Sequence, residues 1–139
     1  MANEPIVLFD LNVILDVLQK REPFYEASAQ LLAYAETGKL QGFLAAHSIT
    51  TLFYLLDKDK SSREARTVLT ALLQILRIAA VDQATIEQAL NLEYKDFEDA
   101  VTMMAAIQCK AEYLLTRNEK DFQPALLPVV KPVDLLGTL

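Results

Sequence analysis

Short continuous apolar runs alternate with helix-length segments along this 139-residue sequence. Residues 6–9, Ile-Val-Leu-Phe, form the first run, which is typical of a strand buried on both faces. Further strands are predicted at residues 42–45, 78–81, 112–116 and, as a short edge strand, 128–130. Because no hairpin signal such as Asn-Gly occurs, the pattern indicates βαβ units. The sequence therefore predicts a mainly parallel sheet of about four to five strands, covered by helices on both faces.

Helix-forming segments fill the intervals between the apolar runs. They are predicted at residues 11–18, 24–35, 48–56, 61 to about 76, 83 to about 92, and 96–110. Gly38 is expected to stop the second helix, and Ser61 with Glu64 has the spacing of a capping box. Asp82 and Asp96 are expected to cap the last two. With no linker or composition break, residues 1–139 read as a single domain.

The composition excludes several classes of protein. A content of 53% hydrophobic residues, with three Gly and five Pro, argues against disorder. No apolar run reaches the roughly 18 residues of a membrane helix, and Glu4 and Pro5 disfavour a signal peptide. The single cysteine favours the reducing cytoplasm. A net charge of −6 argues against a protein that coats nucleic acid, but it leaves room for a local basic patch.

Polar side chains follow two of the predicted strands. Asp10 and Asn12 come directly after the first strand, and Asn118 and Asp121 come after the fourth. In parallel sheets, ligands bind outside the carboxyl ends of strands, where the strand order reverses. We therefore expect these residues to meet at one edge of the sheet.

A third group of acids begins the last predicted helix. Asp96 and Asp99 are three residues apart, so they share a helix face at an end that commonly lies beside strand ends. Clustered carboxylates raise one another's pKa, and a divalent cation relieves the repulsion. Oxygen ligands suit Mg²⁺ or Mn²⁺, whereas zinc ligands are scarce, since His47 and Cys109 are each the sole residue of their kind.

Each of these residues also has a purely structural interpretation. Asp10 can cap a helix, Asp96 and Asp99 can form a capping box, and Asn118 and Asp121 can be turn residues. His47 is expected to be structural, at or before the start of the helix at Ser48. Asp16 and Glu98 have no special spacing, and both are expected to be solvated.

The ordered set of motifs resembles the PIN domain family over nearly the whole chain. The opening motif is Ile-Val-Leu-Phe-Asp10-Leu-Asn12, the third is Asp96-Phe-Glu-Asp99-Ala-Val, and the fourth is Thr116-Arg-Asn118-Glu-Lys-Asp121-Phe. This resemblance implies a Rossmann-like, three-layer α/β/α sandwich. It also implies a Mg²⁺- or Mn²⁺-dependent endoribonuclease that hydrolyses single-stranded RNA, similar to the toxin halves of VapBC-type toxin–antitoxin pairs.

The resemblance implies a role for each matching residue. Asp10, Asp99 and Asp121 would hold the metal, and Asn118 sits where many members have the fourth acid. The supporting residues implied are Asn12, which orients Asp10, together with Thr51, Thr116 and Asp96. The second motif departs from the family, because residues 46–54 contain no acid and Thr51 takes the place of the usual glutamate. Metal affinity is therefore expected to be weaker than in the family.

Basic residues near the predicted site are candidate RNA contacts. They are Lys58, Lys60, Arg63 and Arg66 around one helix junction, and Arg117 and Lys120 beside the fourth motif. The alternative interpretation of the first cluster is a solvated turn.

Two other functions compete with the nuclease. A non-catalytic protein- or RNA-binding module is favoured by the apolar helix over residues 49–56 and a mean hydropathy of +0.20, which fit a homodimer face or a groove for a small antitoxin. A phosphotransfer receiver is disfavoured, because receivers need a lysine after a late strand and Arg117 stands there.

Overall fold

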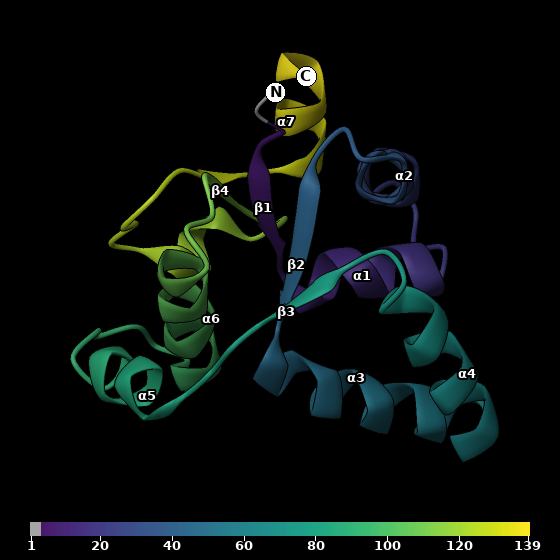
Figure 1. The fold of residues 1–139 in the computed structure, drawn as a ribbon, viewed down its shortest axis with the longest axis horizontal. Coiled ribbons are helices and arrows are strands. Elements are labelled where there is room, and N and C mark those ends of the chain that lie inside the picture. Colours follow the sequence, from purple (N-terminus) through teal and green to yellow (C-terminus); the bar gives the residue numbers. More distant parts are fainter. Residues whose placement is uncertain (1–3) are drawn as a thin grey trace.

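A five-stranded sheet lies between two layers of helices in the computed structural model, which describes residues 4–139 (Figure 1). The first three residues of the predicted domain lie outside this range. The strands are β1 (Ile6–Phe9), β2 (Gln41–Ala45), β3 (Arg77–Ala79), β4 (Tyr113–Leu115) and β5 (Val129–Val130). Their order is β3-β2-β1-β4-β5, and all four neighbouring pairs are parallel. The predicted α/β class and parallel sheet are confirmed.

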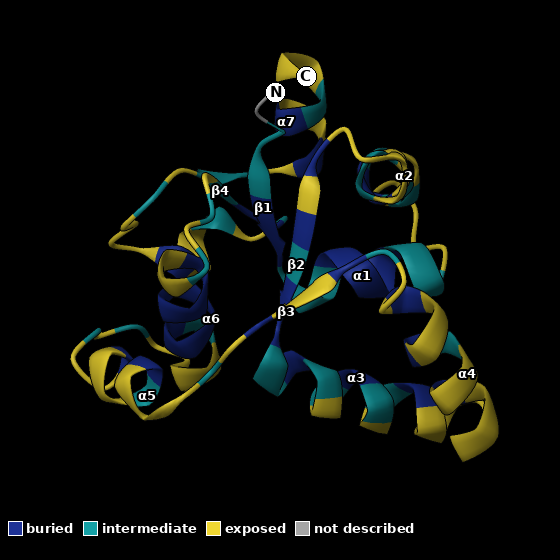
Figure 2. Cartoon of the chain, viewed as in Figure 1, coloured by how far each residue is buried: buried dark blue, intermediate teal, exposed yellow. Residues whose placement is uncertain are grey.

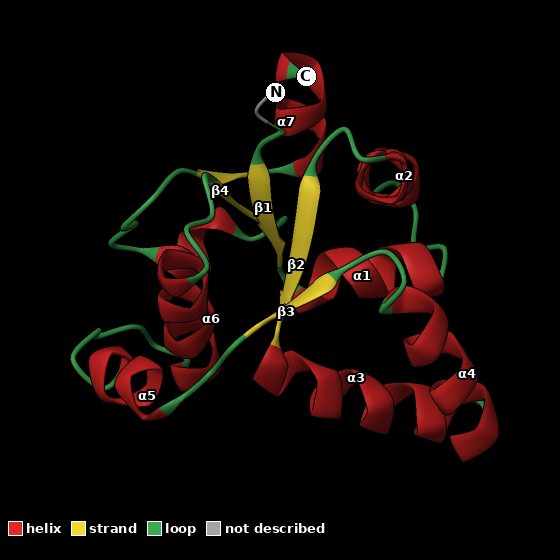
Figure 3. Ribbon diagram, in the orientation of Figure 1, coloured by secondary structure: helices red, strands yellow, loops and turns green. Residues whose placement is uncertain are grey.

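Helices cover both faces of the sheet (Figure 3). One face carries α1 (Leu11–Leu18), α2 (Tyr25–Thr37), α3 (Ala46–Asp59) and α4 (Ser62–Leu72), with α7 (Pro132–Thr138) beside α2; the other carries α5 (Gln83–Ala89) and α6 (Phe97–Gln108). Successive side chains of β1 point to opposite faces of the sheet. Val7 and Phe9 join the core under α1–α4, and Leu8 joins the core under α6. Figure 2 shows how completely α6 is buried compared with α5.

Side-chain caps set the starts of several helices. Asp10 accepts a hydrogen bond from the Leu11 amide, and Ser61 accepts one from the Glu64 amide. Asp82 forms a capping box with Thr85. Asp96 caps α6 by accepting from the Glu98 amide. The alternative in which Asp99 completes a capping box with Asp96 is not realised among the described hydrogen bonds, so the Asp99 carboxylate is directed elsewhere.

The structure differs from the sequence prediction in the second half of the chain. Helix α4 ends at Leu72, because a final turn, in which the Leu76 amide bonds the Leu72 carbonyl, delivers Leu76 into the core. The third strand, predicted at residues 78–81, begins one residue earlier and ends two residues earlier, at Arg77–Ala79. Pro132, expected to end the last strand, instead starts α7, since the first turn of a helix needs no proline amide. A short 3₁₀ helix, η1 (Glu119–Phe122), was also missed.

The predicted interaction helix is largely part of the monomer core. Leu52 and Leu56 are buried, and Ile49 and Phe53 pack against the same core. Among its large apolar side chains, Tyr54 is the one that is strongly exposed, at 61%. Across residues 4–139, no helix combines the length and the apolar character needed to cross a bilayer.

The strand order reverses beside β1, because β2 and β3 lie on one side of it and β4 and β5 on the other. The Asp10 amide donates to the Leu115 carbonyl at 2.8 Å, so the ends of β1 and β4 lie side by side. Ligands of open α/β sheets bind outside such a reversal. The fold therefore places the first and fourth motifs at the expected position for a site.

Candidate active site

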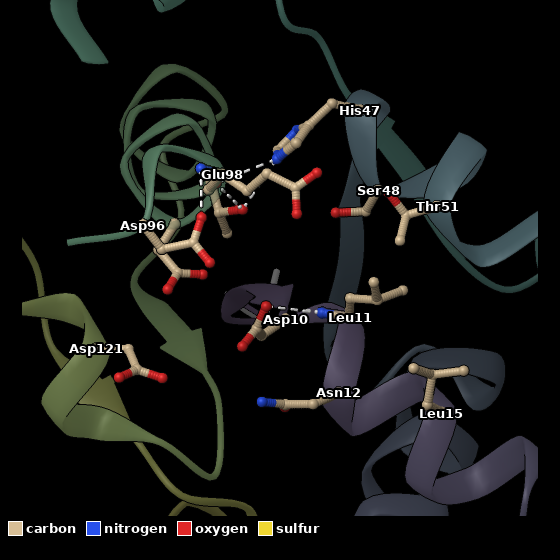
Figure 4. Close-up of a pocket in the computed structure, with 12 residues that line it drawn as sticks. Asp10, Leu11, Asn12, Leu15, His47, Ser48, Thr51, Asp96, Glu98 and Asp121 are labelled. Atoms are coloured by element: carbon tan, nitrogen blue, oxygen red, sulfur yellow. Dashed lines mark hydrogen bonds between the residues drawn. The ribbon is translucent and has the colours of Figure 1, made fainter. Parts of the chain in front are cut away.

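A pocket of about 220 Å³ opens at this reversal point (Figure 4). It lies between the start of α1, the start of α3, the start of α6, and η1. Its polar lining residues are Asp10, Asn12, His47, Ser48, Thr51, Asp96, Glu98, Asp99, Thr102 and Asp121. We call it the acid pocket, because five of these residues are carboxylic acids.

Asp10 is the most tightly held of the acids. Its Oδ1 accepts from the Leu11 amide at 2.8 Å, and its Oδ2 accepts from the Thr116 hydroxyl, also at 2.8 Å. Thr116 is fully buried and follows β4, so the bond joins two neighbouring strand ends. Burial raises the pKa of Asp10 to about 6, although the bonds from Thr116 and Leu11 act to lower it. Asp10 both caps a helix and faces the pocket.

Asp99 stands in the first turn of α6, where the helix dipole favours an acid. Burial raises its pKa to about 7, and the charges of Asp10, Asp96, Asp121 and Glu98 act in the same direction. Glu98 is exposed, as expected, but its side chain adds to the pocket, a contribution that its spacing did not predict. Repulsion among these acids is the electrostatic signature of the site.

The fourth motif contributes its two polar residues unequally. Asp121, in η1, lines the acid pocket. Asn118 is exposed and lines a neighbouring hollow instead. Its backbone amide donates to the Thr116 hydroxyl at 3.2 Å. Of the two candidates for the fourth acidic position, the structure therefore brings Asp121 to the pocket.

The α3 side of the pocket is uncharged. Thr51 lines it, with Ser48 and His47 one turn earlier on the helix. His47 lies within the first turn of α3, and its Nε2 is 3.2 Å from both the Glu98 carbonyl and the Thr102 hydroxyl. Because a carbonyl oxygen can only accept, the hydrogen bond between His47 and the Glu98 carbonyl requires Nε2 to be the donor. His47 thus ties the start of α3 to the helix that bears Asp99, which agrees with a structural role.

Asn12 was expected to orient Asp10, but the structure records no hydrogen bond between the two described side chains. Thr116 and the Leu11 amide hold that carboxylate instead. The Asn12 Oδ1 is buried at the pocket without a described hydrogen-bond partner. A buried amide oxygen without a donor suits a cation or a water bound to one.

The donors of the acid pocket fit Mg²⁺ or Mn²⁺ chemically, since they are oxygens and their mutual repulsion is relieved by a cation. Within residues 4–139, however, no three His, Cys, Asp or Glu side chains are close enough to bind one ion together. The fit is therefore to an ion that keeps several of its own waters, which Mg²⁺ does readily.

Asp16 was expected to be solvated, and this is wrong. Its side chain is 1% exposed and accepts two hydrogen bonds from Arg117, at 2.7 Å from Nε and 3.2 Å from Nη2. Arg21 is a more distant partner, at 3.8 Å. The pair joins α1 to the loop between Thr116 and η1. A separation of 101 residues left no local signal of it in the sequence.

The predicted basic residues fall into two places. Lys58, Lys60, Arg63 and Arg66 surround the α3–α4 junction, toward the end of α3 that lies away from the pocket. Lys58 follows the pocket residue Thr51 by about 10 Å of helix length. Arg66 lies over the Phe53 ring, 5.3 Å from its centroid. Arg117 and Lys120 instead line the hollow next to the acid pocket. The structure thus keeps apart the two groups that the sequence placed at a helix junction and beside the fourth motif.

Residues 6–120, which include every residue of the acid pocket except Asp121, match the PIN domain family. The chain belongs to the PIN domain family. It is 30% identical over 128 residues to "Ribonuclease VapC1" of Aquifex aeolicus, covering 86% of this chain and 85% of that protein.

Solved structures share the fold. A toxin–antitoxin complex from Klebsiella pneumoniae has a chain that is 26% identical, with a TM-score of 0.69 over 91% of this chain and 97% of its own. VapBC2 from Rickettsia felis, bound to a DNA fragment from its promoter, gives a TM-score of 0.70 at 18% identity, over 91% and 98% of the two chains. At 18% identity, the similarity to the Rickettsia felis structure shows a common fold only.

This PIN domain has an asymmetric pocket: acids from α1, α6 and η1 face hydroxyls from α3. The motif pattern predicted Asp10, Asp96, Asp99, Asp121 and Thr51 at this place, and the structure brings them together. It leaves Asn118 and the α3–α4 basic cluster outside. Ser48 and Glu98 were not predicted as pocket residues. Ser48 lies one helical turn before Thr51 and Glu98 lies next to Asp99, and these positions were the available signal.

The Asp16–Arg117 pair is expected to matter for stability. Arg117→Ala leaves a buried, unpaired carboxylate, so we expect it to lower the free energy of unfolding by about 3 kcal/mol. Arg21→Ala removes a longer and more exposed contact, and we expect a loss below about 1 kcal/mol. Urea unfolding at neutral pH measures both. Equal effects of the two variants would contradict the assignment of Arg117 as the main partner of Asp16.

The raised pKa of Asp99 predicts a pH-dependent stability. A carboxyl whose folded-state pKa is about 7, above its unfolded value of 3.8, favours folding when protonated. That contribution is complete below about pH 4 and is lost as the pH rises toward about 7. In EDTA, we expect Asp99→Asn to match wild type near about pH 4 and to be about 1 kcal/mol more stable near about pH 8, after allowance for solvent screening.

The control for this comparison is Asp57→Asn, which neutralises an exposed acid near the far end of α3. Its stability is expected to follow that of wild type at both pH values. If Asp99→Asn is no more stable than this control near about pH 8, the Asp99 carboxylate does not carry the proposed cost of burial and repulsion in the acid pocket.

Proposed function

We propose that this PIN domain is a metal-dependent endoribonuclease that hydrolyses phosphodiester bonds of single-stranded RNA in the cytoplasm. The observation that carries the proposal is the acid pocket at the strand reversal, where Asp10 and Asp99 have raised pKa values and Asp121 completes an open rim. Such a cluster of acids opposes folding, and strongly shifted pKa values in a cleft are typical of functional sites. The similarity to "Ribonuclease VapC1" supports the same reaction class.

The residues have distinct roles in this proposal. Asp10 is immobilised by Thr116 and the Leu11 amide, so it provides a fixed anionic anchor. Asp99 faces it from α6, and Asp121 approaches from η1; both would hold the cation largely through water. When bound, Mg²⁺ or Mn²⁺ would polarise the phosphoryl oxygen and lower the pKa of the attacking water. Thr51 and Ser48 are placed to orient water or substrate from the α3 side.

We also propose that the chain is the toxin of a toxin–antitoxin pair, with a small antitoxin as its partner. The similarity to a chain of the Klebsiella pneumoniae toxin–antitoxin complex supports this assignment. A homodimer stays a prediction. The alternative, a PIN fold that binds RNA or protein without catalysis, is favoured by the uncharged α3 side of the pocket.

RNA cleavage tests the nuclease directly. With Mn²⁺, purified protein is expected to cut unstructured RNA, and Asp10→Asn is expected to abolish cutting because it removes the fixed anionic anchor. Asp57→Asn serves as the matched control and should cut like wild type. Denaturing gels of labelled RNA measure the products. If wild type and Asp10→Asn are equally inert toward varied RNAs with Mg²⁺ and Mn²⁺, the enzyme assignment fails and the binding module is favoured.

Restoring an acid on α3 should strengthen metal binding. We expect Thr51→Glu to raise the affinity for Mn²⁺ about tenfold, equivalent to about 1.4 kcal/mol, because the new carboxylate faces the pocket. Thr50→Glu is the matched control, since Thr50 is exposed and lies outside the pocket lining. Asp99→Ala should weaken binding. Calorimetric titration near neutral pH reports all three, and no detectable binding to wild type at millimolar Mn²⁺ would exclude the metal site.

A further inference from the structure

A basic hollow adjoins the acid pocket on the side of η1. It has a volume of about 500 Å³, its lining includes Arg117, Lys120 and Lys131, and Asp121 lies in the walls of both spaces. The Lys131 Nζ is 3.9 Å from the Glu119 Oε1, but both side chains are well exposed, so the contact is weak. Lys120 is exposed and takes part in no described salt bridge. Three cationic side chains thus meet here beside the carboxylates Glu119 and Asp121, in a chain of net charge −6, and Lys120 is the least compensated of the three.

An apolar hollow of about 320 Å³ continues from the basic one. Arg117 and Lys131 line both hollows, and Phe24, Pro132 and Val133 provide apolar surface. Val133 is 63% exposed and Phe24 is 38% exposed. The three spaces thus form a series, from the acid pocket past Asp121 and the lysines to an open apolar surface.

Arg117 gives the apolar hollow a wall that is held in place on two sides. Its guanidinium is fixed by the two hydrogen bonds to the buried Asp16, and its Cζ lies 4.4 Å from the centroid of the Phe24 ring. A guanidinium fixed over an aromatic ring offers a binding surface that needs little ordering when a ligand binds. Unpaired bases stack on such aromatic and arginine planes.

We propose that the two hollows bind the RNA strand next to the cleaved phosphate. The basic hollow holds backbone phosphates with Lys120 and Lys131, and the apolar hollow receives one unstacked base against Phe24, Val133 and Arg117. The inference rests on the proposed function, and it adds the path of the substrate and a reason for selecting single strands. A base in a duplex is already stacked and paired, so it cannot enter the apolar hollow without being extruded.

Charge decides between RNA and a protein occupant. An apolar side chain of a partner would also fit against Val133 and Phe24, but the same walls carry Arg117 and Lys131 and lead to Lys120. A continuous series of cation-lined and apolar surfaces matches the alternating phosphates and bases of a single strand. The lysines at the α3–α4 junction have no such connection to the acid pocket, so they provide the matched control.

Binding can be measured without cleavage, in EDTA, with a fluorescently labelled single-stranded RNA of about ten nucleotides. Lys120→Gln/Lys131→Gln is expected to weaken binding about tenfold. It should also reduce the slope of log affinity against log salt by about 1.4, the value for two phosphate contacts to a single strand. Lys58→Gln/Lys60→Gln removes the same charge elsewhere and is expected to leave the slope unchanged. Equal slopes for the two double variants overturn the path.

The base subsite has its own readout. Removing the base from one nucleotide of the RNA at a time is expected to weaken wild-type binding most at one position. Val133→Asp should weaken binding of the intact RNA and abolish that position dependence, while the affinity for Mn²⁺ stays unchanged. If Val133→Asp instead leaves RNA binding intact and changes only the mass of the protein in solution, the apolar hollow is a self-association surface and the inference is wrong.

Cleavage kinetics separate failure of this inference from failure of the nuclease assignment. If wild type cuts RNA and the Lys120→Gln/Lys131→Gln enzyme has the same KM as the control, the substrate path is wrong and the nuclease stands. If RNA binds in the lysine-dependent manner but wild type does not cut it, the path stands and the nuclease fails. Thermal unfolding of each variant confirms that these exposed substitutions leave the fold intact.

Discussion

The hydrogen bond from the Thr116 hydroxyl to the Asp10 carboxylate connects the fold to the site. At 2.8 Å, it joins the ends of β1 and β4, the two strands between which the sheet order reverses. Because Thr116 also accepts from the Asn118 amide, the same hydroxyl sets the start of the loop that carries Asp121. One buried polar group therefore fixes the first motif, the fourth motif and the space between them, and burial makes each bond costly to lose.

The features that the sequence predicted correctly are those with a local cause. Strands β1 and β4, the caps at Asp10 and Asp96, and the convergence of Asp10, Asp99 and Asp121 follow from apolar runs and from where parallel strands end. The burial of Asp16 was not predictable, since its partner Arg117 is distant in sequence. Helix α7 was missed because Pro132 has two local meanings, a strand terminator and a first helical residue. The sequence named Asp121 as a metal ligand and Asn118 as the residue at the usual place of the fourth acid. The turn of η1 brings Asp121 to the pocket and leaves Asn118 outside it.

Thr51 lies where the resemblance to PIN domains predicts an acid, and its hydroxyl leaves the α3 side of the pocket uncharged. Helix α3 still presents polar groups to the pocket, and His47 ties its first turn to α6 by contacts with Glu98 and Thr102. These contacts fix the start of α3 against the helix that carries Asp99. An added carboxylate would increase attraction for a cation, but it would also raise the repulsion that burial already imposes on Asp10 and Asp99.

Burial and repulsion at the acid pocket oppose folding, and the surrounding structure must offset them. The Asp16–Arg117 pair contributes to this nearby. Arg117 neutralises the buried Asp16, and the same contact fixes the loop that holds Asp121 near Asp10. The same guanidinium, laid against Phe24, closes one wall of the apolar hollow. Stability of the loop and shape of the proposed RNA path thus depend on one side chain. Natural proteins accept such local strain at functional sites and compensate it nearby, which is the arrangement seen here.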